Sequence, residues 1–409
     1  MGKMQVENIK TLSFGCRLNA LESEKIQAML APHVGAGIVI NTCAVTAEAE
    51  RQSAQSIRKI ARENPNVPLF ITGCAATRNP DLFRDIPHAI VIANQDKRNL
   101  DAYVRGLRAV PCGMATPDMI GALPRENNLS KKFIQVQNGC NHACAYCVTR
   151  LLRGPSVSFD YADIVADARA AVAAGFYEVV LTGVDSASYA RDGRLIGDVC
   201  ADLLRDVPEI QRLRLSSMDP ASPQIFNIID LMHRDARMMP HLHLSMQAGS
   251  DPILAAMGRR HTADMVRQIV AAAPDVTFSW DIICGFPGET DELFRETLEL
   301  ARELGVVRIH AFPFSPRPGT PAADMPGQVL RATSKSRVHQ IMAVADAARA
   351  TWMAARVGQV VSVLVENDNM ARDPHDMPVR IVGAPIVSRT ICDVELTDVR
   401  DDMFIGRVV

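Results

Sequence analysis

The chain has 409 residues, of which 48% are hydrophobic and 22% are charged, and its net charge at pH 7 is -2. No apolar run reaches the roughly 18 residues that span a membrane, and the first ten residues lack the apolar stretch of a signal peptide. We therefore expect a cytoplasmic globular protein of two or three domains. In a reducing compartment, its ten cysteines favour metal binding or catalysis over disulfides.

The first hundred residues alternate short apolar runs with amphipathic ones. "IKTLSF" (9–14), "GIVIN" (37–41) and "VPLFIT" (67–72) are typical of strands. "NALESEKIQAML" (19–30) and "VTAEAERQSAQSIRKIARE" (45–63) have the periodicity of helices. This order predicts an open parallel α/β sheet over residues 1–108.

One cysteine follows each of these three strands: Cys16, Cys43 and Cys74. Because the carboxyl ends of parallel strands form the binding edge of such a sheet, we expect the three thiols to converge. Each cysteine alone would more often be a small buried hydrophobic residue. The Gly- and Pro-rich segment 109–131 that follows suits an interdomain linker, and Cys112 within it has no assigned role.

The alternation of apolar and amphipathic runs resumes at residue 132. Six candidate strands cover 133–137, 178–183, 212–217, 241–246, 277–285 and 308–315, with helical patterns at 161–175, 196–207, 262–273 and 291–305. Six βα repeats are too few for a complete eightfold barrel and predict a partial (β/α)6 barrel over 132–355, closed by a long helix at 335–358. The β-branched, turn-rich residues 356–409 predict a small β domain.

The spacing Cys140-x3-Cys144-x2-Cys147 lies directly after the first of these six strands. A structural zinc site takes four protein ligands, but no fourth cysteine or suitable histidine follows nearby, and His142 lies inside the loop where it is a poor ligand. A [4Fe-4S] cluster held by three thiolates instead leaves one iron open. The pattern favours such a cluster.

This loop on the first strand of a partial barrel resembles the signature of the radical S-adenosylmethionine superfamily. The resemblance implies that the open iron binds S-adenosylmethionine, which the cluster cleaves reductively to a 5′-deoxyadenosyl radical. It places Tyr146 near the adenine, and later strand ends around the rest of the cofactor. The cofactor contacts expected there are Gly183, Asp185, Ser217, Gln247 and Gly285. Glycine permits close approach to a ligand but also serves ordinary tight turns.

Cys16, Cys43 and Cys74, in "FGCRLNALES", "NTCAVT" and "GCAA", resemble the domain of methylthiotransferases that holds a second three-cysteine [4Fe-4S] cluster. The resemblance covers nearly the whole chain. It implies that one S-adenosylmethionine methylates sulfur at this auxiliary cluster, and that a second generates the radical which abstracts hydrogen from the substrate. No catalytic residue beyond the six cluster ligands is expected. The cofactors are thus two [4Fe-4S] clusters and S-adenosylmethionine.

The residues around Cys16 and Cys43 are most similar to the branch that methylthiolates carbon 2 of N6-threonylcarbamoyladenosine at position 37 of tRNA. This implies tRNA and an electron donor as partners. Isopentenyladenosine tRNA, a ribosomal-protein aspartate and a non-catalytic iron–sulfur protein that binds RNA remain as alternatives. Arginines at or near the barrel's strand ends could meet phosphates or the threonylcarbamoyl carboxylate, with Arg150, Arg153 and Arg317 as the expected substrate contacts and Arg259, Arg260 and Arg308 as further candidates.

The C-terminal residues 356–409 occupy the place of the family's small RNA-binding, TRAM-like domain. From residue 357 on, however, they hold nine acidic residues against five arginines. An acidic surface repels phosphates. Either the arginines gather on one face, or tRNA binding depends more on the rest of the chain.

Overall fold

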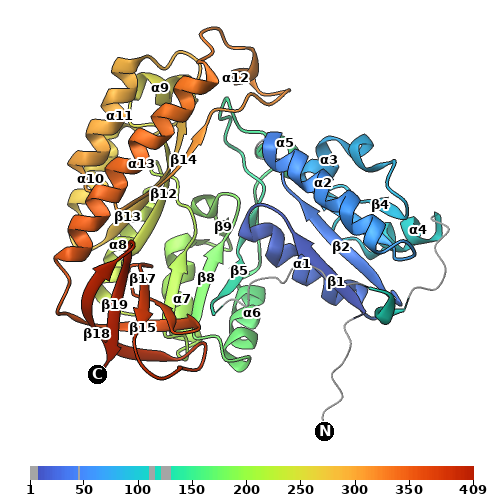
Figure 1. The fold of residues 1–409 in the computed structure, drawn as a ribbon, viewed down its shortest axis with the longest axis horizontal. Coiled ribbons are helices and arrows are strands. Elements are labelled where there is room, and N and C mark those ends of the chain that lie inside the picture. The colour runs from blue at the N-terminus through green and yellow to red at the C-terminus, as the bar shows by residue number, and fades with distance from the viewer. Residues whose placement is uncertain (1–7, 45–46, 110–115, 121–129) are drawn as a thin grey trace. The chain divides into compact units, whose positions relative to one another are not determined.

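The computed structural model describes residues 8–44, 47–109, 116–120 and 130–409. The chain divides into two compact units (Figure 1). One comprises Met1–Asn127, Gly139–His142 and Cys147–Pro155, and the other comprises Asn128–Asn138, Ala143–Tyr146 and Ser156–Val409. Most of the predicted linker 109–131, including Cys112, lies outside the described residues.

The N-terminal unit contains a parallel four-stranded sheet in the order β1-β2-β3-β4, which confirms the predicted α/β sheet and adds a short fourth strand. Its strands are β1 (Ile9–Ser13), β2 (Gly37–Thr42), β3 (Leu69–Gly73) and β4 (Ala89–Val91). Its helices are α1 (Arg17–Leu30), α2 (Ala47–Glu63), α3 (Cys74–Arg78), α4 (Leu100–Ala109) and α5 (Thr149–Arg153).

Both faces of this sheet are buried, as expected for parallel strands. Val39 and Phe70 pack with Ile26 of α1 and Tyr103 of α4. Their chain neighbours point the other way, and Ile38 and Ile71 pack with Ile57 of α2. The alternation of side chains along each strand thus divides the core into two layers and fixes which helix covers which face.

The second unit contains the six predicted parallel strands, in the order β11-β8-β5 and β12-β13-β14. Two parallel bridges, Leu213 to Met238 and Met218 to Leu244, join these two sets. The six strands are β5 (Lys132–Gln135), β8 (Glu178–Thr182), β11 (Arg212–Leu215), β12 (His241–Gln247), β13 (Thr277–Cys284) and β14 (Arg308–Pro313). Short pairs are formed by β6 (Gln137–Asn138) with β7 (Val157–Ser158) and by β9 (Ala190–Arg191) with β10 (Arg194–Leu195).

Helices connect successive strands of this partial barrel, and α13 lies alongside β14 and α11 (Figure 1). They are α6 (Tyr161–Ala173), α7 (Ile196–Asp206), α8 (Gln224–Arg234), α9 (Asp251–Ala256), α10 (Ala263–Ala271), α11 (Asp291–Glu303), α12 (Pro321–Asp324) and α13 (Arg331–Ala354). No helix among the described residues is long and apolar enough to cross a membrane.

The last strands close into a small barrel in the order β15-β16-β17-β19-β18, which confirms the predicted C-terminal β region. They are β15 (Val360–Asn367), β16 (Met370–Arg372), β17 (Pro378–Ile381), β18 (Ile391–Arg400) and β19 (Met403–Val408). Val363, Val379 and Phe404 fill its centre together with Met353 from α13.

Charged residues connect this small barrel to the amino ends of the large barrel's strands. Asp376 bonds to Lys131 Nζ at 3.0 Å and to Arg308 Nη1 at 3.1 Å. Arg212 donates to the Ser362 carbonyl oxygen at 2.7 Å, and Arg214 donates to the Asp373 carbonyl oxygen at 3.1 Å. The small barrel therefore covers the amino ends of the strands, opposite the carboxyl ends where parallel barrels carry their sites.

Candidate metal and cofactor site

The structure places the three N-terminal cysteines where the sequence predicted them. Cys16 caps the amino end of α1 directly after β1, Cys43 follows β2, and Cys74 begins α3 directly after β3. Gly15 has φ +84°, and a Cβ built on it would lie 2.5 Å from Cys43 Sγ. The loops that carry Cys16 and Cys43 are thus in direct contact, at the carboxyl edge of the sheet.

The other described cysteines differ from these candidates in their surroundings. None of the nine described cysteines forms a disulfide. Burial raises the pKa of the Cys200 and Cys284 thiols to about 12, so both stay protonated, and both pack in the core of the large barrel. They behave as small hydrophobic residues. Cys392 lies within β18, so the remaining six described cysteines are the two predicted trios.

The segment Cys147–Pro155, directly after the cluster motif, belongs to the N-terminal unit. Asn94 connects it to the auxiliary trio, because its Nδ2 lies 3.7 Å from Cys74 Sγ and donates to the Leu152 carbonyl oxygen at 3.1 Å. One amide therefore touches both a predicted ligand of the auxiliary cluster and the loop that follows the other cysteine motif. No pattern in the sequence pointed to Asn94.

A buried group of charged side chains also joins the segment Cys147–Pro155 to the residues around the auxiliary trio. Arg153 donates to Glu22 Oε1 at 2.9 Å and to Asn19 Oδ1 at 2.7 Å. Lys97 donates to Glu22 Oε2 at 2.6 Å, and the side chains of Glu22, Lys97 and Arg153 are at most 4% exposed. We expected Arg153 to contact substrate, but its guanidinium is held inside the N-terminal unit.

The pKa values of this group follow from its charges. Burial alone would raise the pKa of Glu22, but Lys97 and Arg153 outweigh burial and hold the pKa below its ordinary value. Burial lowers the pKa of the Arg153 guanidinium, whereas Glu22 and the thiols of Cys74 and Cys16 raise it, with a net upward shift. A permanently charged guanidinium therefore lies within electrostatic reach of two of the three auxiliary thiols.

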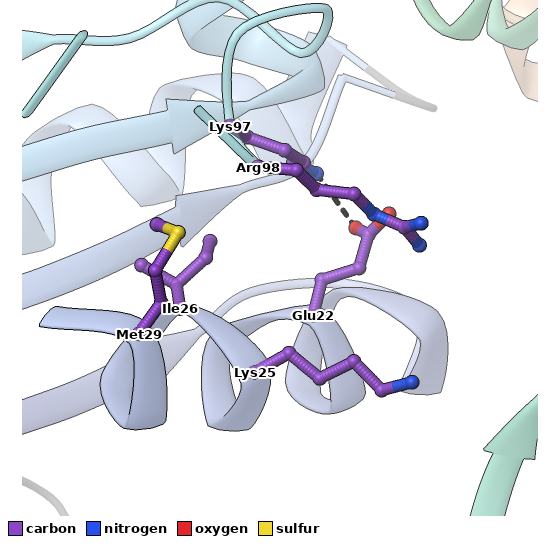
Figure 2. Close-up of a pocket in the computed structure, with 6 residues that line it drawn as sticks. All are labelled: Glu22, Lys25, Ile26, Met29, Lys97 and Arg98. Atoms are coloured by element: carbon purple, nitrogen blue, oxygen red, sulfur yellow. Dashed lines mark hydrogen bonds and ion pairs between the residues drawn. The ribbon is translucent and has the colours of Figure 1, made fainter. Parts of the chain in front are cut away.

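Figure 2 shows the pocket of about 220 Å³ beside this group. Lys97 and Arg98 extend toward Glu22 on α1, and a dashed line marks the bond between Lys97 and Glu22. Ile26 and Met29 give the pocket an apolar wall, and Lys25 adds a further cation. Sequence reasoning missed this pocket, because its residues lie on α1 and on the turn before α4.

Each unit fixes its own part of the cluster motif. In the N-terminal unit, the Cys140 N–H donates to the Gly154 carbonyl oxygen at 3.1 Å, and the His142 N–H points at Cys140 Sγ at 3.4 Å. In the other unit, the Ala145 N–H donates to the Met257 carbonyl oxygen at 2.9 Å, and Arg259 Nη1 lies 3.6 Å from Cys144 Sγ.

Donors directed at cysteine sulfurs are what a thiolate-bound cluster requires, since hydrogen bonds to the sulfurs stabilise their negative charge. Cys74 receives such a donor from Asn94, Cys140 from a backbone amide, and Cys144 from a guanidinium. The residues present in both trios therefore fit iron–sulfur clusters.

The further candidates Arg259 and Arg260 share one acidic partner, although Arg259 is buried and Arg260 is 55% exposed. Asp219, which follows β11, accepts from Arg259 Nη2 at 2.9 Å and from Arg260 Nη2 at 2.6 Å. Asp219 therefore orients the guanidinium that donates to Cys144. Our placement of Arg308 was also wrong: it lies at the amino end of β14, bonded to Asp376, away from the carboxyl edge.

The predicted cofactor contacts all follow or end strands of the large barrel. Gly183 and Asp185 come after β8, Ser217 after β11, and Gly285 after β13. Ser217 Oγ is buried and has no hydrogen-bond partner among the described residues. Gln247 ends β12 at a break in the strand register with φ +70°, a conformation that a non-glycine residue adopts at a cost. An unpaired hydroxyl and a strained residue at strand ends fit a ligand site.

Other members of the predicted set have contacts within the protein. A Cβ on Gly183 would lie 2.9 Å from Gln137 Oε1, which also accepts the Asp185 N–H at 2.9 Å. A Cβ on Gly285 would collide with Ser334 of α13. Packing alone thus explains both glycines. Tyr146 is partly buried against the core of the large barrel.

The expected substrate arginines lie in different environments. Arg150 is exposed on α5, whereas Arg317 is only 3% exposed after β14. Together with the buried Arg153, these arginines do not form a common exposed surface.

Comparisons with known proteins agree with this organisation. Residues 134–301 match the radical SAM superfamily, and residues 8–93 match the uncharacterized protein family UPF0004. A solved structure of the radical S-adenosylmethionine methyltransferase TsrM from Kitasatospora setae, with cobalamin and a [4Fe-4S] cluster bound, superposes with a TM-score of 0.56. At 15% identity, covering 75% of this chain and 69% of that chain, it shows a shared fold.

More similar sequences cover almost the whole chain. The threonylcarbamoyladenosine tRNA methylthiotransferase MtaB of Rickettsia prowazekii is 36% identical over 90% of both chains. The protein of the same name from Thermotoga maritima is 32% identical over 88% of this chain and 87% of its own length. The tRNA-2-methylthio-N(6)-dimethylallyladenosine synthase of Novosphingobium aromaticivorans is 33% identical over 88% of this chain and 87% of its own.

Proposed function

Because this chain belongs to the radical S-adenosylmethionine methylthiotransferase family, we propose that it methylthiolates carbon 2 of N6-threonylcarbamoyladenosine at position 37 of tRNA. The observation that carries the proposal is the presence of two incomplete cysteine trios in one chain, each following strands of a parallel sheet. The branch rests on two relatives named for that substrate, one of them 36% identical.

Cys140, Cys144 and Cys147 would hold the cluster that binds S-adenosylmethionine, and Cys16, Cys43 and Cys74 would hold the auxiliary cluster. When bound, the clusters and the cofactor supply the one-electron chemistry that amino-acid side chains do not provide. In each trio three thiolates leave one iron without a protein ligand.

Other residues of the chain hold the cluster ligands and the segment after Cys147 in position. Asp219 orients Arg259, and Arg259 directs its Nη1 at Cys144 Sγ. Asn94 and Arg153 fasten the segment after Cys147 to the helices and loops around the auxiliary trio. Reactive groups that are held in register can lower a barrier by roughly 7–11 kcal/mol. These bonds are therefore expected to matter for the transfer as well as for folding.

We assign the cofactor contacts to Tyr146, Gly183, Asp185, Ser217, Gln247 and Gly285, of which Ser217 and Gln247 have the strongest support. The Ser217 hydroxyl needs a partner, and Gln247 is held in a strained conformation. Arg150 and Arg317 remain the proposed substrate contacts, and Arg153 is proposed as a positioning residue. The partners would be tRNA and an electron donor, in a reducing cytoplasm.

The direct test uses the anaerobically reconstituted protein with S-adenosylmethionine, a reductant and two tRNAs. One tRNA carries threonylcarbamoyladenosine at position 37 and the other carries isopentenyladenosine. We expect the 2-methylthio product on the first tRNA, detected by mass spectrometry of its nucleosides. Product on the isopentenyladenosine tRNA alone would assign the chain to the other tRNA branch. Cofactor cleavage with neither product would contradict both.

A further inference from the structure

Three polar side chains meet on the inner face of the β12-β13-β14 sheet. Leu244 of β12 and Trp280 of β13 pack into the core on the side of the helices. Because neighbouring residues of a strand point to opposite faces, His243 and Asp281 lie on the inner face. His310 of β14 pairs in register with Asp281 and is on the same face. Parallel barrels usually fill this face with branched apolar residues, so its polarity here needs a reason.

The three side chains form one connected group. His243 Nε2 lies 3.1 Å from Asp281 Oδ2, and His243 Nδ1 lies 2.8 Å from Ser279 Oγ. The rings of His243 and His310 are 5.4 Å apart between centroids. Asp281 and Ser279 thus fix the imidazole of His243 at both nitrogens, which orients its ring toward His310.

This group is accessible to a ligand. The side chains of His243 and Asp281 are 20% and 33% exposed, and His310 is exposed. Phe312, two residues further along β14 on the same face, is 48% exposed. A group that served only to fill the barrel would be buried, because an exposed Phe gains little from packing.

We infer that His243, Asp281 and His310 recognise the threonylcarbamoyl side chain of the modified adenosine and make the enzyme selective for it. This inference rests on the proposed function. The threonylcarbamoyl group ends in a carboxylate and a hydroxyl, both of which accept hydrogen bonds from an imidazole N–H group. The exposed His310 would donate to them, and His243, which is bonded at both nitrogens to Asp281 and Ser279, would position the His310 ring. Asp281 holds the His243 ring in place, and the exposed Phe312 ring offers a face on which a base can stack.

The same chemistry disfavours an isopentenyl group. That group is apolar, so its binding would displace water from this exposed polar surface without offering a hydrogen bond in return. Sites built to hydrogen-bond a substrate reject analogues that lack the bonding group far more strongly than apolar pockets reject an extra group. The polar inner face is therefore a specificity determinant, and the chemistry at the clusters does not depend on it.

The test is a double-mutant cycle between protein and substrate. We would compare wild type, His243→Ala and His310→Ala on tRNA carrying threonylcarbamoyladenosine and on the same tRNA with the threonyl carboxylate converted to its methyl ester. We expect wild type to lose about 10- to 100-fold in kcat/KM on the ester. Each variant should lose a similar factor on the natural side chain and no longer distinguish it from the ester.

Three controls separate recognition from folding. His339→Ala, on the exposed surface of α13, should behave as wild type. Formation of 5′-deoxyadenosine without tRNA should stay within about twofold in every variant, since the inference gives these residues no role in cofactor cleavage. If an alanine variant does not fold, His243→Gln and His310→Gln retain an N–H donor and should keep part of the discrimination.

The outcomes distinguish this inference from the proposed function. If wild type acts on threonylcarbamoyladenosine tRNA but the histidine variants still discriminate the ester as wild type does, the inference fails and the proposed function stands. If wild type acts only on isopentenyladenosine tRNA, both fail.

Discussion

Glu22 is a buried carboxylate that two cations share. It lies on α1, six residues after Cys16, and it binds Lys97 from the turn before α4 and Arg153 from α5. The desolvation of three charges is costly, so such a group adds little net stability, but removal of one member leaves the others uncompensated. The group therefore specifies which segments meet near the auxiliary trio.

Replacing Glu22 with Gln should destabilise the N-terminal unit by about 3–5 kcal/mol, because Lys97 and Arg153 would remain buried without their counter-charge. Hydrogen exchange of the β1–β3 amides under native conditions measures this unit separately. The matched control is Asp81→Asn, which breaks an exposed pair with Arg84 and should change stability by less than about 1 kcal/mol. Equal effects of the two substitutions would contradict the assignment.

The loss of stability in Glu22→Gln should depend on pH. The folded-state pKa of Glu22 lies below its ordinary value of 4.5. A carboxyl group with a lowered pKa contributes stability that is present above the unfolded pKa and is lost as pH falls through the folded one. The stability difference between wild type and Glu22→Gln should therefore be constant from pH 7 to about 5 and shrink below pH 4.5. A difference that grows toward low pH would refute the pairing.

The two cysteine trios should differ in what their loss does to the enzyme. With two [4Fe-4S] clusters, the reconstituted protein should hold about eight irons per chain, and Cys43→Ala or Cys140→Ala should each retain about four. Cys140→Ala should lose cofactor cleavage, whereas Cys43→Ala should keep cleavage and lose sulfur insertion. Cys200→Ala, in the core, is the control and should keep eight irons. Zinc in place of iron would contradict both cluster assignments.

At the scale of elements, the sequence predicted the six strands of the large barrel and three of the four strands of the N-terminal sheet, because each is a short apolar run bounded by turn residues. The short β4 was not predicted. The position of Cys16, Cys43 and Cys74 after successive parallel strands was also predictable, and their convergence on one edge of the sheet stays a prediction. The helix α8 was missed although Ile225, Ile228, Ile229 and Met232 carry a helical period. That signal was available and could have been used.

Ion-pair partners were not predictable. Arg153 meets Glu22 across 131 positions of the chain, and Arg308 meets Asp376 across 68. A charged residue near a strand indicates neither which end of the sheet it faces nor which opposite charge the tertiary structure brings to it. Arg259 and Arg260 looked like phosphate contacts for this reason, whereas Asp219 holds them both.

The junction between the large and small barrels depends on Asp376. Asp376→Asn keeps the left-handed backbone that this residue adopts at φ 63°, but it removes the charge that Lys131 and Arg308 share. We expect a loss of about 3 kcal/mol and faster proteolysis near residues 356–359. Asp398→Asn, in an exposed pair with Arg400, is the control and should be nearly neutral. Unchanged proteolysis in Asp376→Asn would contradict a docking role.

Replacement of Asp373, at the same junction, should stabilise the protein at neutral pH. Burial raises its pKa to about 6, so the folded protein binds this proton more tightly than the unfolded chain does. Its contribution is fully favourable below the unfolded pKa and is lost as pH rises through 6. Asp373→Asn should therefore be more stable than wild type at pH 7.5 by up to about 3 kcal/mol, with the advantage lost at about pH 3, below the unfolded pKa of 3.8. Thermal unfolding at both pH values measures this, and a pH-independent difference would refute it.

For the whole molecule, some of the nine acidic residues of the C-terminal region have a structural use. Asp373 and Asp376 face the large barrel and do not form an acidic outer surface. Three of the five arginines are also engaged: Arg372 pairs with Glu366, Arg400 pairs with Asp398, and Arg389 lies over the Phe176 ring at 3.7 Å. These contacts favour the second of the two alternatives, in which tRNA binding depends mainly on residues outside the small barrel.

The most direct test of the central claim is the content of modified adenosines in tRNA from a strain that lacks this gene. We predict loss of 2-methylthio-N6-threonylcarbamoyladenosine, accumulation of its precursor without the methylthio group, and recovery when the wild-type gene, but not Cys43→Ala or Cys140→Ala, is restored. A normal level of the 2-methylthio form of threonylcarbamoyladenosine in the deletion strain would contradict the account.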